Sequence, residues 1–208
     1  MPGLPNAVRI RQRLAGTREP TDPLDVDVAA LSRRLPDEQV RALLPNLRPA
    51  GVLIPLIDRN GTLSVLLTER SAHLKHHAGQ VSFPGGGMES RDTSITATAL
   101  RETHEEVGIR PTAIDVAGYL NPTPTVTGFA VTPVVGFVVG EPEVIVDRAE
   151  VARAFEVPLD FLMDEGNEVQ TEEEHGGILF RITTFHYDGH RIWGATAGII
   201  KTFREKIL

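Results

Sequence analysis

The chain has 208 residues, of which 41% are hydrophobic and 24% charged, values typical of one globular domain with or without an extension. Its net charge of -7 excludes broad nonspecific binding to nucleic acid, and no apolar run approaches the ~20 residues of a membrane-spanning helix. Because the chain has no cysteine, a bound metal ion would need oxygen or imidazole ligands, which favours Mg²⁺ or Mn²⁺.

Residues 1–48 are rich in proline, arginine and aspartate and are predicted to form an N-terminal extension with short helices. Helical patterns cover residues 26–35 and 37–44. The arginines near the N-terminus are not followed by a continuous apolar segment, so we predict no secretory signal and a cytoplasmic location. Residues 49–208 are predicted to form the main domain.

Apolar and alternating runs predict the strands of the main domain. The runs 51–57 and 63–68 are joined by Asn60-Gly61, a pair that favours the tight turn of a β-hairpin. Helices are predicted from about Thr93 to Val107, before Gly108, and from about Gly194 to the C-terminus. Further strands are predicted at residues 80–83, 114–119, 131–139, 178–187 and 190–193. The predicted fold class is α/β, of the α+β type.

The helix predicted at residues 93–107 carries an unusual set of acids. At about 100° per residue, Glu102, Glu105 and Glu106 share one face, and an apolar face that includes His104 lies opposite. Repulsion among them and with the helix dipole costs on the order of 1–3 kcal/mol, which a divalent cation would offset. The alternative is three ordinary solvated glutamates, with Arg101 paired to Glu105. His104 is predicted to be a hydrogen-bonded core residue.

A glycine run and a basic cluster precede this helix. The segment Phe83–Gly87 is predicted to be a loop whose backbone N–H groups, at Gly85 and Gly86, can approach a phosphate. Cationic side chains that could neutralise phosphate lie upstream, at Arg70, His73, Lys75, His76 and His77. A solvated basic loop is the alternative. The combination favours phosphate chemistry assisted by a metal ion.

The segment Gly79–Ile109 resembles the Nudix box, G-x5-E-x7-R-E-U-x-E-E-x-G-U, in which U is apolar. The match runs from Arg101 to Ile109, apart from Thr103 at an apolar position, and the first acid is replaced and shifted to Asp92. The resemblance implies a Nudix-like mixed β-sheet sandwiched between α-helices. It also implies that Glu102, Glu105 and Glu106 bind Mg²⁺ or Mn²⁺, and that Arg101 orients Glu105.

The shifted aspartate and an upstream signature, Leu66 to Ser71 followed by Gly79 and Phe83–Gly86, resemble the coenzyme A pyrophosphatases. Lys75 stands where that signature has a second arginine. This resemblance implies hydrolysis of coenzyme A or its derivatives to 4′-phosphopantetheine and adenosine 3′,5′-bisphosphate. It makes Arg70, Lys75, Gly85 and Gly86 candidates for substrate binding.

Several alternatives stay open at this point. The substrate could be another small nucleoside diphosphate derivative, such as ADP-ribose, NADH or a dinucleoside polyphosphate, or the chain could be a non-catalytic Nudix-fold binding module. The proton acceptor could be Glu105 or an acid outside the helix, for instance among Glu172, Glu173 and Glu174. The oligomeric state also stays open, with a homodimer among the alternatives.

Overall fold

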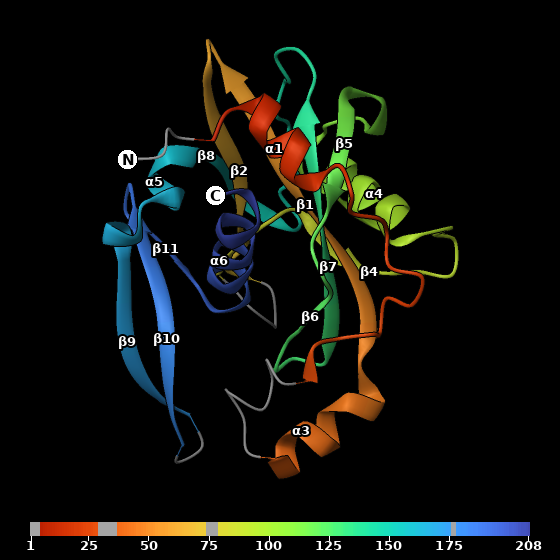
Figure 1. The fold of residues 1–208 in the computed structure, drawn as a ribbon, viewed down its shortest axis with the longest axis vertical. Coiled ribbons are helices and arrows are strands. Elements are labelled where there is room, and N and C mark those ends of the chain that lie inside the picture. The colour runs from red at the N-terminus through yellow and green to blue at the C-terminus, as the bar shows by residue number, and fades with distance from the viewer. Residues whose placement is uncertain (1–4, 29–36, 74–78, 176–177) are drawn as a thin grey trace.

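The computed structural model describes residues 5–28, 37–73, 79–175 and 178–208, which form two β-sheets flanked by helices (Figure 1). The larger sheet has eight strands in the order β3-β2-β1-β7-β5, with β4 paired to β1, β6 to β7 and β8 to β2. Strands β1 and β7 are parallel, and the other pairs are antiparallel. Its strands are β1 (Arg48–Arg59), β2 (Thr62–Arg70), β3 (Val81–Ser82), β4 (Gly85–Gly87), β5 (Ile114–Tyr119), β6 (Thr123–Pro124), β7 (Phe129–Val138) and β8 (Val151–Pro158).

The smaller sheet has three antiparallel strands in the order β11-β10-β9, namely β9 (Glu168–His175), β10 (Ile178–Tyr187) and β11 (His190–Trp193). The α-helices described are α1 (Ala7–Leu14), α3 (Asp37–Leu43), α4 (Ile95–Val107), α5 (Leu159–Met163) and α6 (Gly194–Ile207). Short 3-10 turns occur at Leu44–Asn46, Pro111–Ala113 and Glu165–Asn167. Within the described residues, no helix is both long enough and apolar enough to cross a bilayer.

Helices cover both faces of the larger sheet, because its central strands bury apolar side chains on both sides. In β1, Leu53 and Ile57 pack with α4, whereas Ile54 and Leu56 belong to the core beneath α1 and α6, and all four are fully buried. Each such side chain contributes roughly 1.5–3 kcal/mol through burial. The predicted arrangement, a mixed sheet between helices, is confirmed.

Local signals in the sequence set the ends of the central elements. Asn60 and Gly61 both have positive φ, 56° and 89°, and close the predicted hairpin between β1 and β2. Helix α4 begins after Ser94, whose side chain accepts a hydrogen bond from the Ala97 N–H, and ends at Gly108 with φ 75°. The helix predicted at residues 93–107 is therefore confirmed within two residues.

The N-terminal region contributes to the same core. Helix α1 was not predicted, yet Ile10 and Leu14 are fully buried in the cluster that contains Phe203 and Ile207 of α6. The helix predicted at residues 37–44 is present as α3, whereas most of the pattern at residues 26–35 lies outside the described residues.

Four further elements, β4, β8, α5 and β9, were missed or misread. Strand β8 and helix α5 were not predicted, and the acidic run that includes Glu172 lies in strand β9, not in a solvated loop. Segment Gly85–Gly87 forms strand β4 against β1, so the prediction of a loop there is wrong. In both β4 and β9, hydrogen bonds to a neighbouring strand override weak local strand propensity.

Candidate active site

The candidate site lies where β4 meets the acidic face of α4, and glycines permit that contact. A Cβ at Gly51 of β1 would lie 2.6 Å from the Ile95 carbonyl oxygen, so only glycine lets β1 approach the start of α4 this closely. A Cβ at Gly85 would lie 2.4 Å from the Gly51 carbonyl oxygen, and Gly85 has φ 153°. The glycine run therefore brings strand backbone directly against the acidic helix.

Glu106 is the most deeply buried acid of the site, with 3% of its surface exposed. Its Oε2 accepts a hydrogen bond from the Gly85 N–H at 3.3 Å, and its Oε1 lies 3.8 Å from Nη1 of Arg70. Burial raises the pKa of Glu106 to about 8, and repulsion from Glu102 and Glu150 adds to the rise, which Arg70 opposes. The Gly85 N–H, predicted to face a phosphate, is thus directed at Glu106.

Glu102 lies one turn earlier on α4 and faces Gly86. A Cβ at Gly86 would lie 2.5 Å from the Glu102 carboxylate. The carboxylate therefore occupies space that is open only because residue 86 is a glycine. The Glu102 side chain is 15% exposed. Burial raises its pKa, and hydrogen bonding to Arg101 opposes that rise. Two partly desolvated carboxylates therefore lie side by side against the glycine strand.

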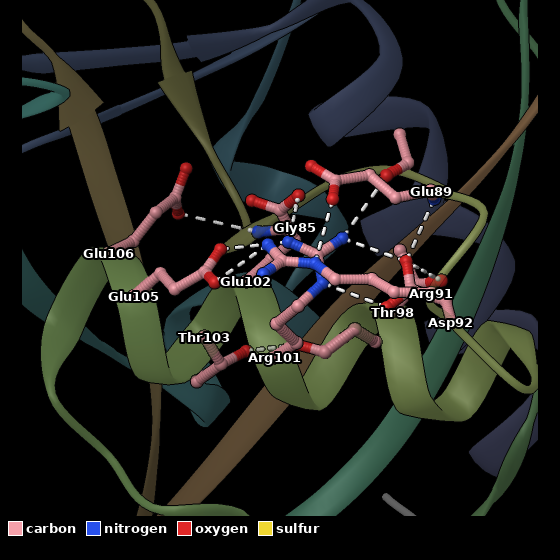
Figure 2. Close-up of polar contacts among 12 residues, drawn as sticks. Gly85, Glu89, Arg91, Asp92, Thr98, Arg101, Glu102, Thr103, Glu105 and Glu106 are labelled. Carbon is pink, nitrogen blue, oxygen red and sulfur yellow. Dashed lines mark hydrogen bonds and ion pairs between the residues drawn. The ribbon is translucent and has the colours of Figure 1, made fainter.

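Arg101 connects the acids of the site, as Figure 2 shows. It donates to Oδ1 of Asp92 through Nε and to Oδ2 through Nη2, both at 2.8 Å. Its Nη1 donates to Glu102 at 2.9 Å and to Glu105 at 2.8 Å, which is the contact predicted for Glu105. The two bonds to Asp92 are the main reason that the pKa of Arg101 is raised and that of Asp92 lowered. The shifted aspartate of the box thus anchors the arginine that holds the glutamates.

Glu105 differs from its two neighbours because its side chain is 46% exposed. Its Oε2 accepts from Arg101, and its Oε1 accepts from Nη2 of Arg91 at 3.1 Å. The predicted convergence of three acids is therefore met by Glu102 and Glu106, with Glu105 at the rim. Within the described residues, no group of three or more carboxylate or imidazole side chains is already arranged to hold a metal ion.

The buried face of α4 is not the one predicted. His104 is exposed, so its assignment to the core is wrong. The helix instead buries Thr98 and Thr103 together with Ile95, Ala99 and Val107. The threonines can be buried because their hydroxyls are satisfied: Thr103 donates to the Ala99 carbonyl at 2.7 Å, and Thr98 donates to Asp92 at 3.1 Å.

Sequence reasoning missed a fourth glutamate near the site. Glu150 lies in the turn before β8, and its repulsion is among the causes that raise the pKa of both Glu102 and Glu106. Backbone bonds fix this turn: the Asp147 N–H donates to the Glu106 carbonyl, and the Ser71 N–H donates to the Glu150 carbonyl. No spacing signal links residue 150 to α4, because only the folded chain brings them together.

The other predicted candidates have different locations. Arg70 lies beside Glu106, and its buried Nε has no hydrogen-bond partner among the described residues. Lys75, His76 and His77 lie outside the described residues. Glu172 is on β9, at the opposite side of the molecule from α4 in Figure 1, and the side chains of Glu173 and Glu174 are not described.

The charge balance of the site is suited to a cation. Among the described residues, the charged groups that these interactions link are three guanidiniums, of Arg70, Arg91 and Arg101, and six carboxylates, of Glu89, Asp92, Glu102, Glu105, Glu106 and Glu150. Two of these carboxylates, of Glu102 and Glu106, have raised pKa values because they are buried and because neighbouring carboxylates repel them. Carboxylate oxygens are the ligands that Mg²⁺ and Mn²⁺ prefer. The residues present therefore fit a divalent ion of this kind.

Comparison with known proteins agrees with the fold and with this site. The family profile described as the NUDIX domain matches residues 47–181. Nudix hydrolase NudL of Citrobacter koseri is 44% identical over 169 residues, covering 81% of this chain and 88% of that protein. NudL of Escherichia fergusonii is 43% identical over 162 residues, covering 78% and 84%. Both relatives are described as uncharacterised.

Among solved structures, the NUDIX domain of Shewanella oneidensis NrtR, complexed with ADP ribose, has the same fold. The TM-score is 0.51 with 17% identity, covering 88% of this chain and 99% of that one. The chain belongs to the Nudix hydrolase family. The predicted family and enzyme class are confirmed. Nudix hydrolases act on small nucleotide derivatives and generally use divalent metal ions.

Proposed function

We propose that this chain hydrolyses the diphosphate bond of coenzyme A or its derivatives with Mg²⁺ or Mn²⁺, giving 4′-phosphopantetheine and adenosine 3′,5′-bisphosphate. The observation that carries the proposal is the pair of buried carboxylates, Glu102 and Glu106, which lie against the glycines of β4 and repel each other. The upstream signature, from Leu66 to Gly86, supports coenzyme A as the substrate. A cytoplasmic location is part of the proposal.

Glu102, Glu105 and Glu106 would hold the metal ion, and Arg101, anchored by Asp92, would position Glu102 and Glu105. When bound, the ion supplies positive charge to the diphosphate and makes the attacking water more acidic. Glu102 and Glu106 are already directed at the glycine strand, whereas Glu105 must exchange at least one guanidinium partner. Arg101 keeps its two bonds to Asp92 during that exchange, which maintains the geometry of the helix face.

Glu150 is our candidate for the proton acceptor. Its carboxylate makes no hydrogen bond or ion pair with another described residue, although it is close enough to Glu102 and Glu106 to affect both pKa values. Glu105 is less suitable, because guanidinium groups occupy both of its oxygens. Water oxygen would bond to one phosphorus as the bridging oxygen leaves, and Glu150 would take the proton of that water.

Substrate phosphates would be bound by positive charge at the edge of the site. Arg70 is suited to the diphosphate, because its guanidinium lies beside Glu106 and its Nε is unpaired among the described residues. Gly85 and Gly86 provide backbone without side-chain bulk next to the same carboxylates. Lys75 remains a prediction for the additional ribose phosphate of coenzyme A.

The alternative substrates are ADP-ribose, NADH and dinucleoside polyphosphates. ADP-ribose belongs among them because the NrtR domain that shares this fold was solved with ADP ribose. A non-catalytic binding module is disfavoured, because Glu102, Glu105 and Glu106 are all present, the first two bonded to Arg101 and the third to the Gly85 N–H.

A substrate panel tests the proposal. The purified chain is incubated with coenzyme A, dephospho-coenzyme A, ADP-ribose, NADH and diadenosine tetraphosphate, in Mg²⁺, in Mn²⁺ and in EDTA, and products are identified by mass. We expect the fastest turnover with coenzyme A, cleavage at the diphosphate, and none in EDTA. Glu106→Gln is the matched inactive control. Faster cleavage of another compound would overturn coenzyme A, and turnover in EDTA would overturn the metal requirement.

A further inference from the structure

Arg91, in the loop between β4 and α4, occupies part of the candidate metal site. Its Nε lies 2.8 Å from Oε2 of Glu89, and its Nη2 lies 3.1 Å from Oε1 of Glu105 (Figure 2). The guanidinium therefore bridges a loop acid and a predicted metal ligand. Arg91 lies outside the Arg101–Ile109 part of the Nudix pattern and takes no part in the proposed mechanism.

The backbone around Arg91 is held by hydrogen bonds, whereas its side chain lies at the surface with exposed partners. The Glu89 N–H donates to Oδ2 of Asp92 at 2.8 Å, and the Asp92 N–H donates to the Glu89 carbonyl at 3.0 Å. These bonds close a turn around residue 91, and the bonds from Arg101 hold Asp92 in place. The Arg91 side chain is 60% exposed and its partner Glu89 is 52% exposed, so solvent screens their ion pair.

A divalent ion that binds Glu105 must compete with two guanidiniums, and Arg91 is the one that will leave. Arg101 occupies Oε2 of Glu105, but it is 15% exposed and is also bonded to Asp92 and Glu102. Arg91 occupies Oε1 and is otherwise paired only with the exposed Glu89 among the described residues. The cation with fewer and more exposed partners is displaced at the lower cost.

Resting on the proposed function, we infer that Arg91 is a phosphate-binding residue whose guanidinium has two positions. In the metal-free protein it neutralises Glu105, and when a divalent ion binds Glu105 the guanidinium transfers to a phosphate oxygen of the substrate. The guanidinium would have to move only a short distance, from Oε1 of Glu105 to a phosphate oxygen bound to the same ion. Two oxygens that share one Mg²⁺ lie within about 4 Å of each other, because each ion–oxygen bond is about 2.1 Å. Arg91 already contacts one such oxygen, and its planar fork suits phosphate.

The test measures two affinities of Arg91→Ala without relying on turnover. Mn²⁺ is titrated into metal-free protein and the free ion is followed by electron paramagnetic resonance. ADP, a probe with the same diphosphate group, is then titrated by calorimetry at saturating Mn²⁺. We expect Arg91→Ala to bind Mn²⁺ about threefold more tightly, because a competing cation is gone, and ADP about tenfold more weakly, because a phosphate contact is lost.

Arg110→Ala is the matched control, because Arg110 is exposed beyond the end of α4, and both affinities should stay at the wild-type values. Urea unfolding of each variant verifies the fold. Unchanged or weaker Mn²⁺ binding by Arg91→Ala would overturn the inference that Arg91 competes with the ion for Glu105. Unchanged ADP binding would overturn the inference that the Arg91 guanidinium then binds a substrate phosphate. A wild-type protein that binds no Mn²⁺ would instead refute the proposed function, so the two failures are distinguishable.

Discussion

Asp92 and Arg101 form a two-bond ion pair, with both donor–acceptor distances 2.8 Å and with side chains 4% and 15% exposed. Asp92 is the residue at which this chain departs from the spacing of the family pattern, and the pair explains how the site tolerates that departure. The carboxylate approaches from the loop before the helix and anchors the guanidinium that contacts Glu102 and Glu105. The displaced acid thus acts as a positioning residue.

Breaking this pair should destabilise the protein. We expect Asp92→Asn to lower the free energy of unfolding by about 3 kcal/mol, because the substitution leaves a largely buried guanidinium without its main partner. Urea denaturation at pH 7 measures the loss. The matched control is Asp115→Asn, which breaks the exposed pair between Arg11 and Asp115 and should cost about 1 kcal/mol or less. Equal losses for the two variants would contradict the assigned role.

Glu106 should make stability depend on pH. Its pKa is raised from 4.5 to about 8 in the fold, so its contribution to stability is complete below pH 4.5 and is lost as the pH rises through 8. Glu106→Gln stays neutral and should be more stable than wild type at pH 9 by about 5 kcal/mol, since the pKa of Glu106 rises from 4.5 to about 8 on folding and one pKa unit corresponds to about 1.4 kcal/mol.

The measurement for Glu106 is urea unfolding in EDTA at pH 5 and at pH 9. At pH 5 the two proteins should differ little, because Glu106 is then protonated in the fold. Adding Mg²⁺ at pH 9 should remove the advantage of Glu106→Gln, because the ion compensates the charged carboxylate of the wild type. If Glu106→Gln were no more stable than wild type at pH 9, the claim that ionising the buried Glu106 destabilises the fold would be refuted.

The glycines of β4 offer a matched pair of substitutions. In Gly86→Ala the new Cβ would lie 2.5 Å from the Glu102 carboxylate, so the side chain of Glu102 must move, whereas in Gly87→Ala the nearest atom is 3.6 Å away. We expect Gly86→Ala to lose about 100-fold in kcat/KM, because small displacements of catalytic groups cost that much. Gly87→Ala should stay near wild type. Steady-state kinetics with coenzyme A measure both, and similar losses would refute a specific role for Gly86.

Glu150→Gln tests the proposed proton acceptor. We expect kcat to fall about 100-fold or more, because the neutral amide cannot accept the proton of the attacking water. The pH dependence of kcat should also change shape, which a purely structural residue would not cause. Glu143→Gln is the matched control, an exposed glutamate earlier in the same segment. Wild-type turnover by Glu150→Gln would return the role to Glu105.

The parts of the fold that sequence predicts are those with local signals. The hairpin at Asn60-Gly61 and the ends of α4 follow from turn and capping residues within a few positions. Strand β9 could not be recognised, because its residues Glu168–His175 become a strand only by pairing with β10.

The site shows the same division between local and long-range information. The box residues from Arg101 to Glu106 lie on one helix, so spacing alone groups them. Helical periodicity placed the buried face incorrectly, because it counted Thr98 and Thr103 as polar although both are buried with satisfied hydroxyls. The approach of Glu150 depends on the path of the chain between β7 and β8 and has no local signal.

The burial of helix α1 bears on how this family should be dissected. The family match covers residues 47–181. One apolar cluster of the fold also includes residues that precede this segment in the sequence, Ile10 and Leu14, and residues that follow it, Phe203 and Ile207. A fragment trimmed to the matched residues would expose the surface that these four side chains cover. The segment that defines membership in the family is therefore smaller than the unit that folds.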